Sequence, residues 1–198
     1  MPQSKPIRSV CVYCGSSNAA DPDFIDAAAK FGAVLAQEGI RLVYGGGGIG
    51  LMGACAKAAH DGGGKVLGVM PEFLRQREIL YDDVETIVVK SMHERKMIMF
   101  EESDAFVVLP GGVGTLEEVV ELMSWHRLGL HDKPLVFLNM KSYWEPFFEL
   151  IRHTVDHHLT PASFLDAWRS AAQVDDILPA LKAMGEDHAP APIIPLVT

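Results

Sequence analysis

Short apolar stretches that alternate with helical segments constrain the fold of this chain more than any other sequence feature. Six such stretches are nearly continuous in apolar side chains, as strands are when helices cover both faces of their sheet. Segments with the apolar period of an amphipathic helix lie between most of them. An alternation of this spacing predicts an α/β fold in which a parallel sheet lies between two layers of helices.

The expected elements follow each other without an internal repeat or a linker. The predicted strands cover residues 7–14, 40–44, 65–70, 84–89, 105–109 and 134–138. The predicted helices cover residues 23–38, 51–60, 92–103, 115–128, 143–157 and 174–184. Residues 72–81 are charged and predict a short helix or a lid-like loop.

The chain has 198 residues, enough for about one domain at ~150 residues per domain. We therefore expect a single domain over residues 1–184, a Rossmann-like three-layer sandwich with a central, mostly parallel sheet flanked by helices. Residues 185–198 contain three prolines and predict an extended or disordered tail. In such folds a ligand binds at the carboxyl ends of the strands, where the strand order reverses.

The formal net charge of −9, from 17 basic and 26 acidic residues, disfavours nucleic acid and anionic membranes as partners. One small basic cluster is large enough for a small anion only; it contains Arg75, Arg77, Lys90, Arg95 and Lys96. The apolar runs are shorter than the ~20 residues of a membrane helix, and residues 1–8 have no hydrophobic signal core. We expect a cytoplasmic protein.

Three cysteines include a C-x-x-C pair, Cys11 and Cys14, which invites a redox or zinc interpretation. The pair lies in a predicted strand, whereas a redox pair needs a helix N-terminus, and residues three apart on a strand face opposite sides. A zinc site would need two further ligands at a matching spacing. We expect structural cysteines in a reducing compartment, with Cys55 as the third, and no metal.

The strongest motif is Pro-Gly-Gly-Val-Gly-Thr-Leu-Glu-Glu at residues 110–118, between an apolar strand and a long helix. Glycines let the backbone approach a ligand closely, and N–H groups at a helix N-terminus attract a phosphate. The alternative is a capping box, with Thr115 as the N-cap and Glu118 three residues later. A cap does not need three glycines before it. The adjacent Glu117 and Glu118 indicate that a carboxylate faces something other than phosphate, such as sugar hydroxyls or a water.

A second glycine loop covers residues 45–53 and contains the G-x-G-x-x-G spacing of dinucleotide sites at Gly45, Gly47 and Gly50. NAD binding would also need an acidic residue at the end of the next strand, where Val69-Met70-Pro71 stands instead. A cradle for a mononucleotide or a sugar phosphate fits this loop better.

The third motif is Met-His-Glu-Arg-Lys at residues 92–96, which opens the helix before the fifth strand. It could be a solvated helix start. However, Arg95 and Glu118 lie on adjacent strand–helix units and should meet at one edge of the sheet. An arginine that holds a phosphate or ribose beside a carboxylate is a plausible hydrolytic pair.

With these three motifs the chain resembles the LONELY GUY (LOG) family, over about residues 9–181. The resemblance implies a phosphoribohydrolase that cleaves the N-glycosidic bond of N6-substituted AMP (cytokinin nucleotides), and also AMP, to free base and ribose 5-phosphate. It implies that Arg95 and Glu118 are catalytic. It implies substrate binding by a larger set: Gly45, Gly46, Glu78, Lys96, Gly112, Val113, Gly114, Thr115, Leu116, Glu117 and Ser124.

The same resemblance implies a small-molecule nucleoside monophosphate as the partner, no cofactor, and a homodimer with the site near the interface. In this hypothesis Glu118 stabilises the oxocarbenium-like sugar and orients water. Arg95 holds the ribose or phosphate. The 112–115 loop holds the 5′-phosphate, so nucleosides should be poor substrates.

Two alternatives come from other classes. One is a non-catalytic carrier of a phosphorylated cofactor such as a molybdopterin, which would keep the glycine loop but has no need of Arg95 and Glu118. The other is a lysine decarboxylase, which requires pyridoxal phosphate on a lysine and for which the sequence shows no recognisable site.

Overall fold

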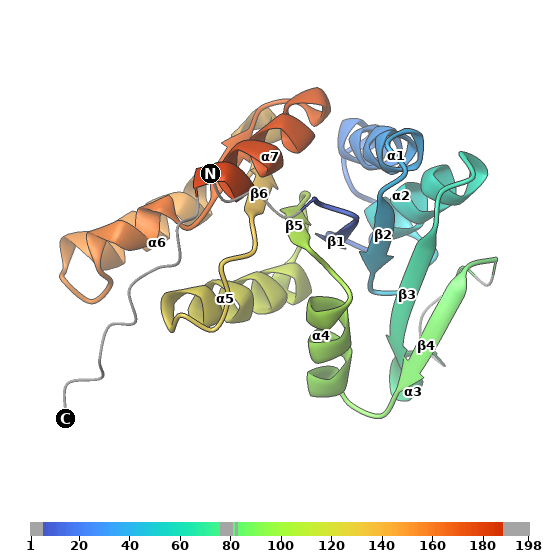
Figure 1. Cartoon of the computed structure of the whole chain (residues 1–198), viewed down its shortest axis with the longest axis horizontal. Coiled ribbons are helices and arrows are strands. Elements are labelled where there is room, and N and C mark those ends of the chain that lie inside the picture. Colours follow the sequence, from blue (N-terminus) through green and yellow to red (C-terminus); the bar gives the residue numbers. More distant parts are fainter. Residues whose placement is uncertain (1–5, 76–80, 82, 188–198) are drawn as a thin grey trace.

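The structure is a computed structural model that describes residues 6–75, 81 and 83–187. In these residues seven strands form one sheet in which every neighbouring pair is parallel (Figure 1). Their order is β4-β3-β2-β1-β5-β6-β7. The strands are β1 Ser9–Tyr13, β2 Arg41–Tyr44, β3 Val66–Pro71, β4 Glu85–Val89, β5 Ala105–Val108, β6 Leu135–Leu138 and β7 Arg169–Ala171.

Helices cover both faces of this sheet (Figure 1). The α-helices are α1 Pro22–Gln37, α2 Gly50–Asp61, α3 Glu72–Arg75, α4 Met92–Glu101, α5 Val113–Arg127, α6 Glu145–Asp156 and α7 Ile177–Asp187. The described residues also form three short 3-10 helices: η1 Met140–Ser142, η2 Ala162–Asp166 and η3 Val174–Asp176.

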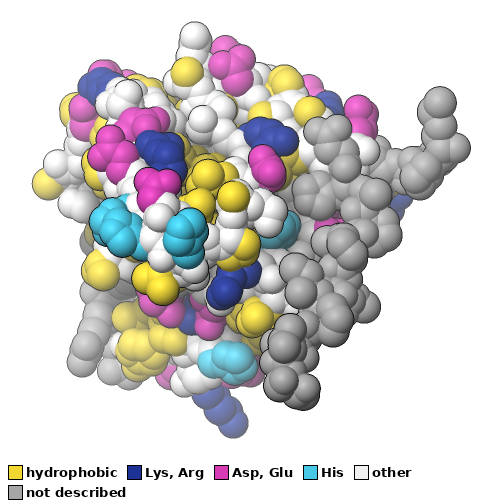
Figure 2. Space-filling model, turned by 90° about the vertical axis from the view of Figure 1, so that its left-hand side faces the viewer, with side chains coloured by type: hydrophobic (Ala, Val, Ile, Leu, Met, Phe, Trp, Pro, Cys, Tyr) yellow, Lys and Arg dark blue, Asp and Glu magenta, His cyan; other side chains and the backbone are white. Residues whose placement is uncertain are grey.

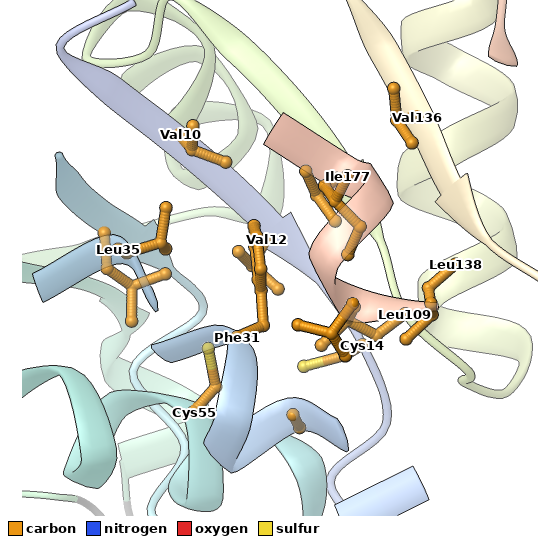
Figure 3. Close-up of a cluster of buried hydrophobic side chains, with 14 of the residues drawn as sticks. Val10, Val12, Cys14, Phe31, Leu35, Cys55, Leu109, Val136, Leu138 and Ile177 are labelled. Atoms are coloured by element: carbon orange, nitrogen blue, oxygen red, sulfur yellow. The ribbon is translucent and has the colours of Figure 1, made fainter. Parts of the chain in front are cut away.

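Alternation along β1 divides the core into two halves. Val10 and Val12 face α1, α2 and α7, where Phe31 and Ile177 meet them (Figure 3). Cys11 and the other odd-numbered side chains face the opposite layer, which α4, α5 and α6 form. Because successive residues on a strand point to opposite faces, one central strand buries side chains in both layers.

The α/β prediction is confirmed, and the described sheet is parallel throughout rather than mostly parallel. All six predicted strands are present, whereas β7 was not predicted, because three residues carry too little pattern. Helix α5 begins at Val113, two residues before the predicted start. Helix α7 continues to Asp187, so the first three residues of the predicted tail are helical, and residues 188–198 lie outside the described part.

The three cysteines are free and buried. Cys11 lies in one half of the core and Cys14 in the other, as the strand pattern predicts (Figure 3 shows Cys14 and Cys55). Burial raises the pKa of the Cys55 thiol to about 12, and it raises the pKa values of the other two as well. The thiols therefore stay protonated and pack as small apolar groups.

The strand order reverses between β1 and β5, because β2 lies on one side of β1 and β5 on the other. The loops that follow these two strands meet at their carboxyl ends, where Gly15 N donates to Pro110 O at 3.0 Å. Gly15 O in turn accepts from Met52 N of α2 at 3.2 Å. This reversal brings the loops that contain the glycine motifs to one place.

On the face of the molecule shown in Figure 2, basic side chains lie apart from one another, among acidic, histidine and hydrophobic ones. In the part of the chain that the structure describes, every helix is too short or too polar to cross a bilayer.

The stability of the fold should depend on His131, which fastens the end of α5. Its Nε2 lies 2.9 Å from Leu122 O, and its Nδ1 accepts from Lys133 N at 3.2 Å, so the neutral ring satisfies both partners. Burial lowers the pKa of His131 to about 4.

We predict that the neutral His131 ring contributes fully to the free energy of unfolding above pH 6.5, where the histidine is neutral in the folded and the unfolded chain. This stabilisation is lost as the pH falls toward 4. Below pH 6.5 the unfolded chain binds the proton first, which costs the folded state about 3 kcal/mol by pH 4. Urea unfolding of the protein and of His131→Gln between pH 7.5 and 4 measures it. The stability gap between the two should narrow as the pH falls, and a constant gap would contradict the assignment.

Candidate active site

Helix α4 carries the arginine of the site, and its start is fixed by two caps. Ser91 Oγ accepts from Glu94 N at 3.1 Å, and Glu94 Oε2 accepts from Lys90 N at 2.9 Å. This reciprocal pattern satisfies N–H groups that have no partner within a helix. Because α4 begins directly after β4, its first turn lies at the carboxyl edge of the sheet.

Arg95 is 5% exposed and its guanidinium is held by backbone carbonyls. Its Nε donates to Val69 O at 3.1 Å, and its Nη2 donates to Gly45 O at 3.2 Å. These oxygens lie in β3 and just after β2, so the arginine extends across the ends of both strands. A buried charge is tolerated only with such partners.

Glu118 meets this arginine from α5. Its side chain is 5% exposed, and its Oε1 lies 3.7 Å from Arg95 Nη2. Burial is the largest cause that raises the pKa of the Cys11 thiol, and the negative charge of Glu118 is the second largest. The expectation that these two residues lie at one edge of the sheet is confirmed.

The glycine loop leads into α5 at the same edge. Gly112 is the N-cap, and the N–H groups of the first turn that follows have no partner within the helix. Gly112, Val113 and Gly114 are exposed, and a Cβ on either glycine would meet open space. At Gly111 a Cβ would overlap the side chain of the buried Thr115. The loop therefore offers exposed backbone donors where the helix dipole favours an anion.

The capping-box alternative is wrong. Because α5 begins at Val113, Thr115 is the third helical residue rather than the N-cap, and Glu118 lies in the second turn. The carboxylate is thus directed to Arg95 instead of to the helix terminus.

Lys96 joins the two helices of the site. Its Nζ lies 2.5 Å from Glu117 Oε1 and 2.8 Å from Glu121 Oε2. Burial of the Lys96 ammonium by itself lowers its pKa. The hydrogen bonds to the two carboxylates outweigh burial, so the pKa of Lys96 is raised above its ordinary value. The lysine is thus a stable cation beside the catalytic candidates.

Ser124 lies on the outer side of α5, at helical spacing from Glu117 and Glu121. It lines a groove of about 640 Å³ that also includes Leu116 and Val120. Ser124 is exposed and lies about three turns beyond the glycine loop, so it is the predicted residue nearest the C-terminal end of α5. Glu78, the other peripheral residue of the prediction, lies outside the described residues.

The second glycine loop, residues 45–53, packs against Arg95 and so belongs to the same site. A Cβ on Gly45 would overlap the Arg95 guanidinium, and Gly46, at φ +82°, lies against Met70. A Cβ on Gly50 would collide with the backbone of residues 16–17. The absence of side chains at these glycines permits close packing of the backbone. This packing explains why the loop is rich in glycine and why its spacing resembles a dinucleotide fingerprint.

Sequence reasoning missed two contacts of this site. Glu121 binds Lys96, and its i,i+4 spacing from Glu117 was a usable signal. Tyr143 Oη donates to Gly111 O at 2.7 Å, from a loop after β6 that no motif marked.

A family model described as "Possible lysine decarboxylase" matches residues 52–181. A rice protein (Oryza sativa subsp. japonica) named cytokinin riboside 5′-monophosphate phosphoribohydrolase LOG is 48% identical over 145 residues, which are 73% of this chain and 60% of the rice protein. The Arabidopsis thaliana protein named cytokinin riboside 5′-monophosphate phosphoribohydrolase LOG3 is 40% identical over 95% of this chain and 86% of its own length.

Solved structures with this fold include the molybdenum cofactor binding protein of Rippkaea orientalis, 22% identical with a TM-score of 0.68 over 91% of this chain and 99% of that one. The molybdenum cofactor carrier protein of Chlamydomonas reinhardtii is 25% identical with a TM-score of 0.67 over 89% and 96%. These solved structures share the architecture, and the matched range of the family model includes the motifs at residues 92–96 and 110–118. This chain therefore belongs to the LOG family, the family of the "Possible lysine decarboxylase" model.

Proposed function

We propose that this chain hydrolyses the N-glycosidic bond of N6-substituted AMP, and of AMP itself, to the free base and ribose 5-phosphate. The observation that carries the proposal is the buried pair of Arg95 and Glu118 beside the glycine-rich start of α5. The activity for which the plant relatives are named supports the same reaction.

The 5′-phosphate binds at the first turn of α5, in residues 112–115. There the unpaired N–H groups and the helix dipole supply positive potential without a bulky side chain in the way. This binding fixes the nucleotide, so that its glycosidic carbon is held near the carboxylate one turn further along the helix.

Glu118 acts on the glycosidic bond. As the bond from C1′ to the base breaks, its electrons leave with the base and positive charge grows on the sugar ring. A fixed carboxylate stabilises that charge, and it orients the water whose oxygen bonds to C1′. The water gives up a proton and the departing base gains one, so the hydrolysis balances.

Arg95 keeps the carboxylate in place and contributes a donor for the ribose or phosphate. Two of its N–H groups are already bound to the carbonyls of Val69 and Gly45, so the guanidinium cannot swing away. A cation fixed in this manner costs little reorganisation when the substrate binds.

The carrier alternative is less well supported. The solved molybdenum cofactor proteins share only the fold with this chain. A carrier would need the anion-binding loop, but it has no use for a buried carboxylate such as Glu118 beside that loop. The decarboxylase suggested by the family description would need a lysine that forms a Schiff base. Lys96, the buried lysine of this site, is bound by two carboxylates that raise its pKa, the opposite of what that chemistry requires.

We place this enzyme in the cytoplasm as a homodimer. Free, buried cysteines are typical of a reducing compartment. Large apolar side chains are exposed along and just beyond α5: Val113, Val120, Leu128 and Leu130. A second copy that covers this face would lie beside the groove that contains Ser124 and Glu117, next to the proposed substrate site.

Replacing Glu118 by Gln should lower kcat for N6-isopentenyl-AMP and AMP at least about 100-fold, because the neutral amide no longer stabilises the cationic sugar. Chromatography of the released base measures it. Glu149→Gln, an exposed change on α6, is the matched control and should keep full activity. The matching nucleosides should release little base with the unaltered enzyme. Equal turnover of nucleosides and monophosphates would contradict the phosphate site.

Replacing Gly45 by Ala should lower activity by about 100-fold, because its Cβ must displace the Arg95 guanidinium and a small misplacement of a catalytic group is costly. Gly185→Ala in α7 is the matched control, since a Cβ there makes only ordinary contact with Pro134. Activity assays and thermal unfolding of both variants separate the effects. An active Gly45→Ala enzyme would show that the position of Arg95 does not matter.

Replacing Val120 by Glu should convert the homodimer to a monomer, because the new charge lies on the apolar face beside Glu117 and Glu121. Light scattering after size exclusion gives the mass. Leu150→Glu on α6, also exposed, should stay dimeric. A monomeric unaltered protein, or a dimeric Val120→Glu variant, would refute this interface.

A further inference from the structure

We infer that Tyr143 is a positioning residue that holds the glycine loop in the shape that binds a phosphate. The inference rests on the proposed function, because it assigns Tyr143 to the phosphate end of that site. The observation behind it is the hydrogen bond from Tyr143 Oη to Gly111 O at 2.7 Å, which ties the loop after β6 to the loop after β5.

The peptide that joins Gly111 to Gly112 explains why this bond matters. In a trans peptide the carbonyl and the N–H point in opposite directions. When Tyr143 holds the Gly111 carbonyl on one side, it also fixes the direction of the Gly112 N–H on the other. That N–H belongs to the N-cap of α5, among the donors assigned to the phosphate.

The neighbouring carbonyls are held too. Pro110 O accepts from Gly15 N at 3.0 Å, and Gly112 O accepts from Leu116 N at 3.0 Å. Three successive peptides of the loop are therefore oriented. Backbone groups hold the first and the third, whereas the side chain of Tyr143 holds the one between them.

Glycine makes this restraint necessary. Two successive glycines give a ligand access to the backbone, but they leave that backbone free to rotate. A peptide that rotated would turn its N–H away from the phosphate. The tyrosine hydroxyl supplies the rigidity that the glycines lack, without adding bulk to the ligand side of the loop.

Tyr143 is itself firmly placed. Its ring packs edge-on against Phe24 at 5.3 Å and against Trp144 at 5.0 Å between ring centroids. The two residues before it, Lys141 and Ser142, have left-handed backbone angles, with φ of 54° and 56°. Lysine and serine rarely adopt this conformation, which the surrounding structure must therefore hold.

Ion pairs provide that support. Lys141 Nζ lies 2.6 Å from the carboxylates of both Asp21 and Asp23, at the start of α1. The turn after β6 is thus fastened to a neighbouring helix, and it delivers the tyrosine hydroxyl to the glycine loop at a defined distance.

The test is Tyr143→Phe, which keeps the ring and removes the hydroxyl. Isothermal titration measures the binding of ribose 5-phosphate and of adenine to each protein. We expect ribose 5-phosphate to bind about 10-fold more weakly and adenine to bind unchanged. With AMP as substrate, KM should rise by a similar factor while kcat changes little, since the lost contact serves binding before and during the reaction.

Tyr81→Phe is the matched control. Its hydroxyl lies 2.9 Å from His60, near the end of α2 and away from the start of α5, so both affinities should stay unchanged. Equal affinity of the unaltered protein and Tyr143→Phe for ribose 5-phosphate would overturn the inference. Equal weakening of ribose 5-phosphate and adenine would also overturn it, because the effect would then be a general loss of structure. An unaltered protein that binds no ribose 5-phosphate would refute the proposed function itself.

Discussion

The burial of one guanidinium governs the arrangement of this site. Arg95 lies beneath the loops at the carboxyl edge of the sheet, where an unpaired charge would be very costly. Two strand-end carbonyls and the carboxylate of Glu118 offset that cost. Each partner constrains the chain further. Gly45 must lack a side chain so that its carbonyl can approach, and α5 must begin early enough to direct Glu118 inward.

The parallel sheet explains why these groups meet at all. Every described strand ends at the same edge, and the reversal of order at β1 and β5 leaves a gap between loops that lead in opposite directions. Residues separated by 50 positions, such as Arg95 and Gly45, become direct partners there. The chemistry of the site is therefore a consequence of topology as much as of residue type.

The sequence predicted the strands, the layers and the meeting of Arg95 with Glu118, because apolar period and loop position determine all three. It did not predict β7, whose three residues carry no clear period. It misplaced the start of α5, because Thr115 and Glu118 have the spacing of a capping box, and only the tertiary contact of Glu118 with Arg95 decides against it. The role of Tyr143 was also beyond sequence reasoning, since a hydrogen bond to a carbonyl 32 residues away leaves no local pattern.

The proposed reaction also accounts for why phosphate binding and bond cleavage share one helix. A helix rises ~1.5 Å per residue, so the first turn of α5 and Glu118 are separated by about one turn, or ~5 Å, along its axis. This separation is comparable to the length of a ribose 5-phosphate from its phosphate to C1′. A rigid helix that binds one end of the sugar phosphate therefore sets where the other end lies. Loops that held phosphate and carboxylate separately could not fix that distance, whereas α5, fastened to α4 by Lys96, does so before the substrate arrives.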